Sequence, residues 1–170
     1  LGSNGKCSTT QIIAVVNHIL SEKDAPDVIN LSLGGEINKA DPFLDTQNEL
    51  IQSLVAKGIT VVVSAGNDST DAGNYSPANI SNVITVAASN SSNFRSSYSN
   101  FGTVIDIAAP GDNIFTYTMG GGYTSSYSGT SFASPFVAAA AATVLMLDDS
   151  LTPTQVETKI KDAAFPIVNN

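Results

Sequence analysis

Apolar residues along this chain recur in two patterns, one typical of amphipathic helices and one typical of buried strands. The helical pattern places an apolar residue at every third or fourth position, and Ser8 stands where the first helix needs an N-cap. The sequence therefore predicts helices over 8–20, 46–58, 131–147 and 152–164.

Four short runs are almost continuously apolar and rich in β-branched residues. They cover 27–33, 59–68, 82–89 and 103–111. Runs of this kind are typical of parallel strands whose two faces are both covered by helices. The glycine-rich segment at 115–129 predicts a hairpin after the last of them.

The order of these elements predicts a single α/β domain with a mostly parallel sheet flanked by helices. With 170 residues the chain is long enough to bury a core of its own. Open parallel sheets carry their chemistry at the carboxyl ends of the strands. A functional site is therefore expected at 32–35, at 64–68 and in the loop before residue 131.

Composition excludes some classes of partner. The chain carries a formal net charge of -8 with only 7 Lys and Arg residues, which gives no basic surface for nucleic acid. No apolar run reaches the roughly 18 residues of a membrane span, so no such span is expected. The single cysteine, Cys7, cannot form an internal disulfide and is expected to be a partly buried apolar side chain.

Ser131 opens the Ala-rich helix and has two possible roles. The positive end of a helix dipole and its unpaired N–H groups favour a developing oxyanion beside such a serine. Gly129 and Ala133 leave room for a substrate carbonyl, and Pro135 cannot donate a helical hydrogen bond to the Ser131 carbonyl. Serine is also a common helix cap, so these residues alone allow either a nucleophile or a cap.

Asn67 follows the apolar run at 59–68 within the sequence A-G-N-D. Its carboxamide could donate a hydrogen bond to a negatively charged oxygen. Asparagine is also a common turn residue, and that interpretation stays open from the residues alone.

Taken together, these motifs resemble the subtilisin-like serine proteases. GTSFASPFVAAAAA is similar to the nucleophile motif of that family, and VVSAGND is similar to the segment that carries its oxyanion-hole asparagine. INLSLGG resembles the segment that lines its substrate groove, and NYSPANISNVITVAAS with RSSYSNFGTVIDIAAPG is most similar to the proteinase K-like branch. The resemblance covers residues 1 to about 164. Phe136 and Ala139 depart from the usual histidine and glycine of the nucleophile motif.

The resemblance implies a role for each matching residue. Ser131 would attack the scissile carbonyl, and the Asn67 side chain with the Ser131 backbone N–H would bind the oxyanion. Two short segments would form the walls of the substrate groove. These are Ser32, Leu33 and Gly34 on one side, and Ser64, Ala65 and Gly66 on the other. No charge lines the primary pocket among these residues, so a preference for apolar or aromatic side chains is implied.

A structural calcium ion is also implied by the resemblance. The matching ligands are the Asp106 side chain and the backbone carbonyls of Ser81 and Val83. Asp106 lies in the apolar stretch VIDIA, where a buried carboxylate needs a cation or hydrogen-bond donors. An acid at a strand end that accepts hydrogen bonds from backbone N–H groups is the alternative.

The general base of such a protease has no match in this chain. The one histidine, His18, falls opposite the apolar stripe of the first predicted helix and is expected to be solvated. The family places its catalytic aspartate and histidine before the point that matches residue 1. We therefore expect the C-terminal part of a peptidase domain without its N-terminal strands, inactive alone and completed by an upstream fragment that carries both residues.

The resemblance implies that the full protein is secreted and cleaves peptide bonds. A non-catalytic peptide-binding or scaffold protein built on the protease fold is the alternative, because it needs no base. A nucleotide-binding domain is disfavoured, because GGG at 120–122 follows no strand-to-helix turn and no phosphate-binding motif occurs.

Overall fold

The computed structural model describes residues 7–118 and 120–167, and it contains four α-helices and eight strands within them. Helices span Thr9–Ser21 (α1), Leu44–Ala56 (α2), Thr130–Leu147 (α3) and Pro153–Asp162 (α4), with a 3-10 turn at Ala72–Asn74. Strands span Val28–Leu31 (β1), Gly35–Glu36 (β2), Thr60–Ser64 (β3), Tyr75–Ser76 (β4), Ile84–Ser89 (β5), Ile107–Pro110 (β6), Ile114–Tyr117 (β7) and Tyr123–Tyr127 (β8).

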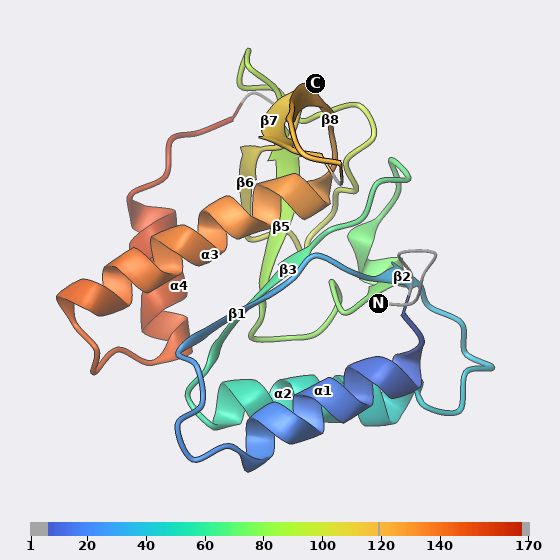
Figure 1. Cartoon of the computed structure of the whole chain (residues 1–170), viewed down its shortest axis with the longest axis vertical. Coiled ribbons are helices and arrows are strands. Elements are labelled where there is room, and N and C mark those ends of the chain that lie inside the picture. The colour runs from blue at the N-terminus through green and yellow to red at the C-terminus, as the bar shows by residue number, and fades with distance from the viewer. Residues whose placement is uncertain (1–6, 119, 168–170) are drawn as a thin grey trace.

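A four-stranded parallel sheet in the order β1-β3-β5-β6 forms the centre of the molecule (Figure 1). Two antiparallel pairs, β2 with β4 and β7 with β8, lie outside it. The α/β fold with a mainly parallel sheet flanked by helices is thereby confirmed.

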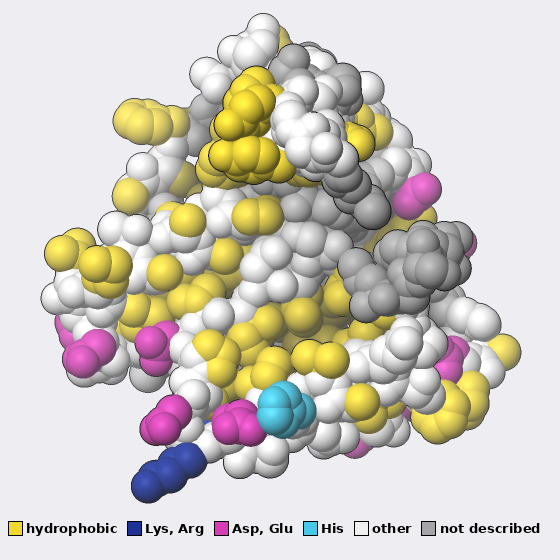
Figure 2. Space-filling model, in the orientation of Figure 1, with side chains coloured by type: hydrophobic (Ala, Val, Ile, Leu, Met, Phe, Trp, Pro, Cys, Tyr) yellow, Lys and Arg dark blue, Asp and Glu magenta, His cyan; other side chains and the backbone are white. Residues whose placement is uncertain are grey.

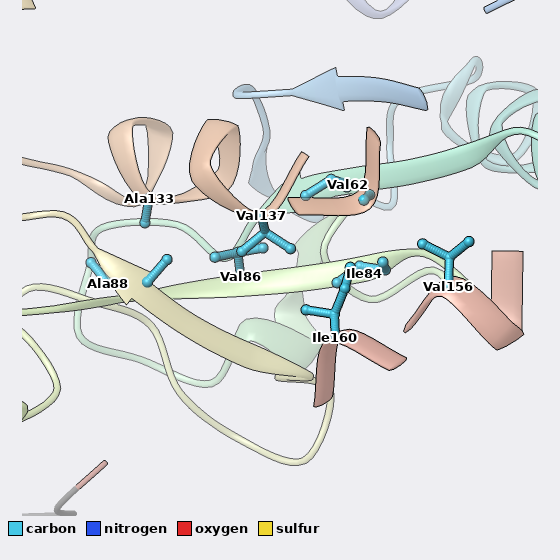
Figure 3. Packing of buried hydrophobic residues seen from close by; sticks show 10 residues of the cluster. Val62, Ile84, Val86, Ala88, Ala133, Val137, Val156 and Ile160 are labelled. Atoms are coloured by element: carbon cyan, nitrogen blue, oxygen red, sulfur yellow. The ribbon is translucent and has the colours of Figure 1, made fainter. Parts of the chain in front are cut away.

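Helices cover both faces of this sheet, and β3 shows why its sequence is continuously apolar. Val61 and Val63 pack with α1 and α2, whereas Val62 packs with α3 and α4. Successive side chains of a strand point to opposite faces, so a strand covered on both sides needs apolar residues at every position. Figure 3 shows the layer between the sheet and helices α3 and α4. Helix residues of this layer pack on strand residues of β3 and β5; the helix residues are Ala133, Val137, Val156 and Ile160, and the strand residues are Val62, Ile84, Val86 and Ala88.

The helix starts follow the capping signals. Ser8 and Thr152 each form a capping box with the glutamine three residues on, so α1 and α4 begin where the sequence predicts. Helix α2 begins at Leu44, two residues before the predicted start. Its N-cap, Phe43, makes no side-chain cap hydrogen bond, so no sequence signal marked that boundary.

All four predicted strands are shorter than expected, and two of the differences bear on the site. β3 ends at Ser64, and the segment that follows it is a loop. β6 begins at Ile107, so the interpretation of Asp106 as a residue within a strand is wrong. Asp106 lies directly before the strand, where its backbone N–H donates to the Thr85 carbonyl.

Helix α3 is mostly apolar but is not enclosed. Within the described residues it alone has the length and composition of a membrane-crossing helix, and 28% of that window is buried. Thr and Ser residues interrupt the apolar run within α3, so a count of consecutive apolar residues did not single this helix out. It packs on the parallel sheet and on α4, as the core helix of a globular domain does.

One surface that includes α3 stands out for its exposed apolar groups. Phe136 is 50% exposed and Met146 is 86% exposed, while β1 has no partner on its outer side among the described residues. Figure 2 shows hydrophobic side chains gathered in the hollow between α3 and α1, over β1. We call this surface, made by β1 and the outer side of α3, the open face.

Candidate active site

Ser131 occupies the first turn of α3 but does not cap it. The N-cap is Gly129, and the Ser131 hydroxyl makes no hydrogen bond to any described residue. The capping role that the sequence left open is therefore wrong. A half-buried hydroxyl at a helix N-terminus, without a partner of its own, is free to approach a substrate.

The Ser131 carbonyl is bound by a residue from the end of β1. Pro135 has no N–H to donate to it, as the sequence predicts, and the Ser32 hydroxyl donates instead at 2.9 Å. The Ser134 hydroxyl lies 3.0 Å from the same Ser32 oxygen. Ser32 thus ties the first turn of α3 to the sheet by its side chain, a contact in addition to the backbone role that the resemblance implies.

We predict that Ser32→Ala in the full-length protein lowers the free energy of unfolding by about 1 kcal/mol, because the part-buried Ser131 carbonyl loses its donor. Denaturant unfolding would measure the change. The matched variant is Ser53→Ala, whose hydroxyl donates to the Glu49 carbonyl on an exposed helix surface. Equal losses for the two variants would contradict a special role of the Ser32 bond.

Asn67 lines the same pocket as Ser131, and its amide is held in one orientation. Its Oδ1 accepts hydrogen bonds from the Thr130 backbone N–H at 2.8 Å and from the Thr130 hydroxyl at 2.9 Å. A backbone N–H can only donate, so the atom facing it must be the amide oxygen. The Asn67 N–H donors are therefore left to point away from Thr130.

The loop that carries Asn67 is organised by Asn100, which is completely buried. The Asn100 side chain accepts from the N–H groups of Asp68 and Thr70 and donates to the Ala65 carbonyl. Gly66 has φ +103°, and a Cβ on it would collide with the Asn100 amide. Glycine is thus required both by the backbone conformation and by the close approach of Asn100.

A half-buried tyrosine, Tyr98, supports the other side of the Ser131 loop. The Gly129 N–H donates to the Gly111 carbonyl at 2.9 Å, and the Tyr98 hydroxyl lies 2.8 Å from that same carbonyl. The Tyr98 hydroxyl also lies 2.6 Å from Asp112 Oδ1. Burial, followed by the hydrogen bond to the Asp112 carboxylate, raises the pKa of Tyr98 to about 12.

This pKa predicts a loss of stability in alkali. An unfolded tyrosine loses its proton near pH 10, whereas folded Tyr98 keeps it up to about pH 12. Its contribution to the free energy of unfolding is therefore fully present below pH 10 and is lost as the pH rises through 12. The free energy of unfolding, measured with denaturant between pH 9 and 12, should fall less steeply with pH for Tyr98→Phe than for the wild type. Identical slopes would contradict the prediction.

All eight residues assigned to catalysis and substrate binding line one pocket of about 520 Å³. It contains Ser131 and Asn67, the segments 32–34 and 64–66, and six further residues. Those six are Gly35, Glu36, Asp68, Tyr75, Ser76 and Ala78. Glu36 and Asp68 thus add two acidic side chains to this pocket, beyond the six wall residues among which no charge was expected. Asp68 closes the quoted motif VVSAGND, whereas Glu36 directly follows INLSLGG.

Asp106, the expected calcium ligand, already has two partners. Its Oδ2 accepts from the Thr85 backbone N–H at 2.8 Å, and its Oδ1 lies 3.1 Å from the Lys161 ammonium on α4. The backbone-bonded acid that the sequence left as an alternative is thus present, with a protein cation beside it. The expected carbonyl ligands, Ser81 and Val83, belong to the segment that leads into β5 next to Thr85.

His18 is exposed on α1, and its Nδ1 lies 3.4 Å from Glu22. Helix α1 packs on the face of the sheet opposite α3, so His18 is not a part of the pocket. The prediction of a solvated histidine is confirmed, and so is that of a half-buried Cys7.

The motifs did not predict the residues that hold the site in place. Thr130, Asn100 and Tyr98 act through partners that are distant in sequence, and each has a side chain common in loops. Thr130 adjoins Ser131 in the nucleophile motif, and Tyr98 and Asn100 lie in the matching segment RSSYSNFGTVIDIAAPG, but these motifs do not identify their partners.

Comparison with known proteins identifies relatives over almost the whole chain. The profile of the Subtilase family matches residues 1–170. Alkaline serine exoprotease A of Vibrio alginolyticus is 40% identical over 96% of this chain and 29% of its own length. Subtilisin-like protease 4 of Trichophyton rubrum is 41% identical over 100% of this chain and 42% of its own.

Solved structures show the same likeness. A cold adapted subtilisin-like serine proteinase superposes with a TM-score of 0.87 at 35% identity, over 96% of this chain and 57% of the other. A Pseudoalteromonas arctica protease superposes with a TM-score of 0.79 at 29% identity, over 91% and 52%. The chain thus spans less than half the length of the two curated relatives and just over half of the solved ones. With its profile match, fold and pocket, this chain belongs to the subtilase family of serine proteases.

Proposed function

We propose that this chain is the nucleophile-bearing part of a secreted serine endopeptidase that cleaves peptide bonds through an acyl-enzyme on Ser131. One observation carries the proposal. Thr130 orients the Asn67 amide so that its donors are available in the pocket that contains the Ser131 hydroxyl, which has no hydrogen-bond partner among the described residues. That arrangement is suited to stabilising an oxyanion formed by attack of this serine.

In the proposed reaction, the Ser131 oxygen attacks the carbonyl carbon of the scissile bond while a base accepts its proton. The carbonyl oxygen becomes an oxyanion and receives hydrogen bonds from the Asn67 amide and the Ser131 backbone N–H. Collapse breaks the C–N bond, and the protonated base gives its proton to the leaving amine. Water then attacks the acyl-enzyme by the same route and releases the serine.

The pocket walls suit an extended peptide. The segment 32–34 follows β1, and the backbone groups of such a segment can pair with a peptide as an added strand. The segment 64–66 forms the other wall, and its small side chains leave the space between the walls open. We propose that the peptide lies between these two walls with its scissile carbonyl at Ser131.

The base and its orienting carboxylate are proposed to come from an upstream segment of a longer protein. His18, the one histidine in this chain, lies outside the pocket. The open face offers an unpaired strand edge beside exposed apolar side chains, which in a soluble protein marks a surface for further packing. We propose that the upstream segment adds strands to β1 and covers α3, and that residues 1–170 alone are inactive.

A peptide-binding scaffold without activity is the second proposal, favoured by the absence of a base in the described pocket. The test is hydrolysis of an unfolded protein substrate by the purified full-length protein, with and without a serine-directed sulfonyl fluoride. Hydrolysis that the reagent abolishes supports the peptidase. Saturable binding of the substrate without any hydrolysis supports the scaffold. Recovery of the protein from the culture medium tests the proposed secretion.

For calcium, we propose a structural site formed by the Asp106 carboxylate and the carbonyls of Ser81 and Val83. These are the hard oxygen donors that Ca²⁺ prefers, and the bound ion would fix β5 to the start of β6. The Lys161 ammonium lies 3.1 Å from Asp106 Oδ1, so a bound Ca²⁺ must compete with it for this carboxylate.

Replacing Lys161 by methionine is therefore expected to raise the affinity of the full-length protein for Ca²⁺ about two- to fivefold, because an exposed competing charge is removed. Titration calorimetry with CaCl₂ measures it, and Lys159→Met on the same helix is the matched charge control. An unchanged affinity for Ca²⁺ in Lys161→Met would contradict the site. So would the absence of calcium binding by both the wild type and Lys161→Met.

A further inference from the structure

The start of α3 is not fixed by a side-chain cap of its own. Its N-cap, Gly129, has φ +157° and makes no side-chain cap hydrogen bond. Glycine restricts its own backbone less than any other residue does. The position of Ser131, two residues on, therefore depends on contacts that other segments make with residues 129 and 130. Asn67 accepts the Thr130 N–H, and the Gly111 carbonyl accepts the Gly129 N–H.

Gly111 is packed closely between the end of β5 and the start of α3. Its N–H donates to the Ser89 carbonyl, the last residue of β5, at 3.0 Å. A Cβ on Gly111 would lie 2.6 Å from the Ala88 side chain and 3.0 Å from the Gly129 carbonyl oxygen. Because so little space separates Gly111 from Gly129, a displacement of the first would be transmitted to the second.

Asp112 follows Gly111 and is held by two hydroxyl groups. Tyr98 donates to its Oδ1 at 2.6 Å, and Ser96 donates to the same oxygen at 2.7 Å. Ser96 is 1% exposed, and no ion pair among the described residues includes Asp112. Hydrogen bonds from a hydroxyl to a carboxylate are shorter and stronger than those between neutral groups. These two bonds therefore hold Asp112, and with it the neighbouring carbonyl, in place.

Tyr98 connects this carboxylate to the carbonyl that binds Gly129. Its oxygen lies 2.6 Å from Asp112 Oδ1 and 2.8 Å from the Gly111 carbonyl oxygen, but a phenol has one proton to donate. The charged acceptor attracts this proton more strongly, which leaves the Gly111 carbonyl available to the Gly129 N–H. Removal of the carboxylate would give the proton to the carbonyl alone and alter its bond to Gly129.

We propose that Asp112 is a positioning residue for Ser131. Its carboxylate holds Tyr98 and thereby fixes the Gly111 carbonyl, which orients Gly129 two residues before the nucleophile. Asp112 is not among the described residues that line the pocket, so it acts through these neighbours. The inference rests on the proposed peptidase function and adds to it a residue that places the reacting serine.

The experiment measures peptide hydrolysis by the full-length protein at a temperature where thermal unfolding shows every variant to be folded. Asp112→Ala should lower kcat about tenfold and leave KM within about twofold, because a small misplacement of a reacting group is costly. Asp112→Asn keeps an oxygen that can accept from Tyr98 and should recover most of the loss. The double variant with Tyr98→Phe should lose no more than Asp112→Ala alone, because both changes act through one contact.

Asp149→Ala is the matched control, because it removes an exposed carboxylate just after the other end of α3 and should leave kcat unchanged. Hydrogen exchange of the Gly129 amide, located by peptide mass spectrometry, is a second measurement that needs no turnover. This exchange should be about tenfold faster in Asp112→Ala than in the wild type, the size expected when a hydrogen bond to a charged group is lost.

The two measurements separate this inference from the proposed function. If no peptide is cleaved but the Gly129 amide exchanges faster in Asp112→Ala, the peptidase proposal fails and the positioning by Asp112 stands. Four results would overturn the inference. They are an unchanged kcat of Asp112→Ala in an active protein, an effect confined to KM, losses that add in the double variant, and unchanged exchange at Gly129.

Discussion

Ser131→Ala is expected to lower kcat for peptide hydrolysis by the full-length protein about 10⁶-fold, the loss that removal of the catalytic serine causes in subtilisin itself. The physical reason is that no acyl-enzyme can form, so only oxyanion binding and substrate positioning remain. KM should change little, because the serine hydroxyl contributes little to ground-state binding. Steady-state kinetics with a chromogenic peptide measures both constants.

Ser128→Ala is a suitable comparison, because Ser128 lies three residues away and its hydroxyl accepts from the Asn113 N–H outside the pocket. It should retain wild-type kcat within a few-fold. A Ser131→Ala protein that keeps more than a tenth of wild-type kcat would rule out Ser131 as the nucleophile.

Asn67→Leu is expected to lower kcat about 10²–10³-fold, a magnitude known from the corresponding donor of subtilisin. Leucine is similar in size to asparagine but donates no hydrogen bond, so the oxyanion loses one of two donors. The substrate carbonyl is uncharged before attack, and the loss should therefore appear in kcat and not in KM. The same peptide assay measures it.

Thr130→Val tests the orientation of the Asn67 amide separately from the hydrogen bond that this amide donates. It removes the hydroxyl that binds Asn67 Oδ1 but keeps the backbone N–H that binds the same atom. Its kcat should fall less than that of Asn67→Leu. A larger fall for Thr130→Val, or an Asn67→Leu effect confined to KM, would show that the Asn67 amide does not stabilise the transition state.

Much of the fold could be predicted because its signals are local. The continuous apolar run of β3 and the capping boxes of α1 and α4 depend on neighbouring residues alone. The boundaries failed where no local signal exists. Phe43 precedes α2 without a capping bond, and Asp106 stands before β6 in a run whose apolar character continues on both sides of it.

The motifs predicted which residues share the pocket, but they could not predict what holds those residues. Ser32 reaches the Ser131 carbonyl across 99 positions, and Asn67 meets Thr130 across 63. Lys161 lies 55 positions from Asp106. Such pairs arise only when the sheet brings distant strand ends together, so a one-dimensional pattern does not contain them.

Glu36 illustrates the same limit for the lining of the pocket. It belongs to a two-residue strand, and neither its burial nor its neighbours in sequence mark it as a pocket residue. It pairs with Tyr75 across β2 and β4 and lines the pocket together with Asp68, and these two side chains give the pocket its charge. The pairing of β2 with β4, rather than any motif, determines this feature.

The central claim is that Ser131 is a nucleophile activated by a base outside residues 1–170. The most direct test is fluorophosphonate labelling of the full-length protein, located by peptide mass spectrometry, in the wild type, in His18→Ala and in variants that replace upstream histidines. We predict an adduct on Ser131 that persists in His18→Ala and is lost when one upstream histidine is replaced. An adduct on another residue, or labelling that depends on His18, would contradict the claim.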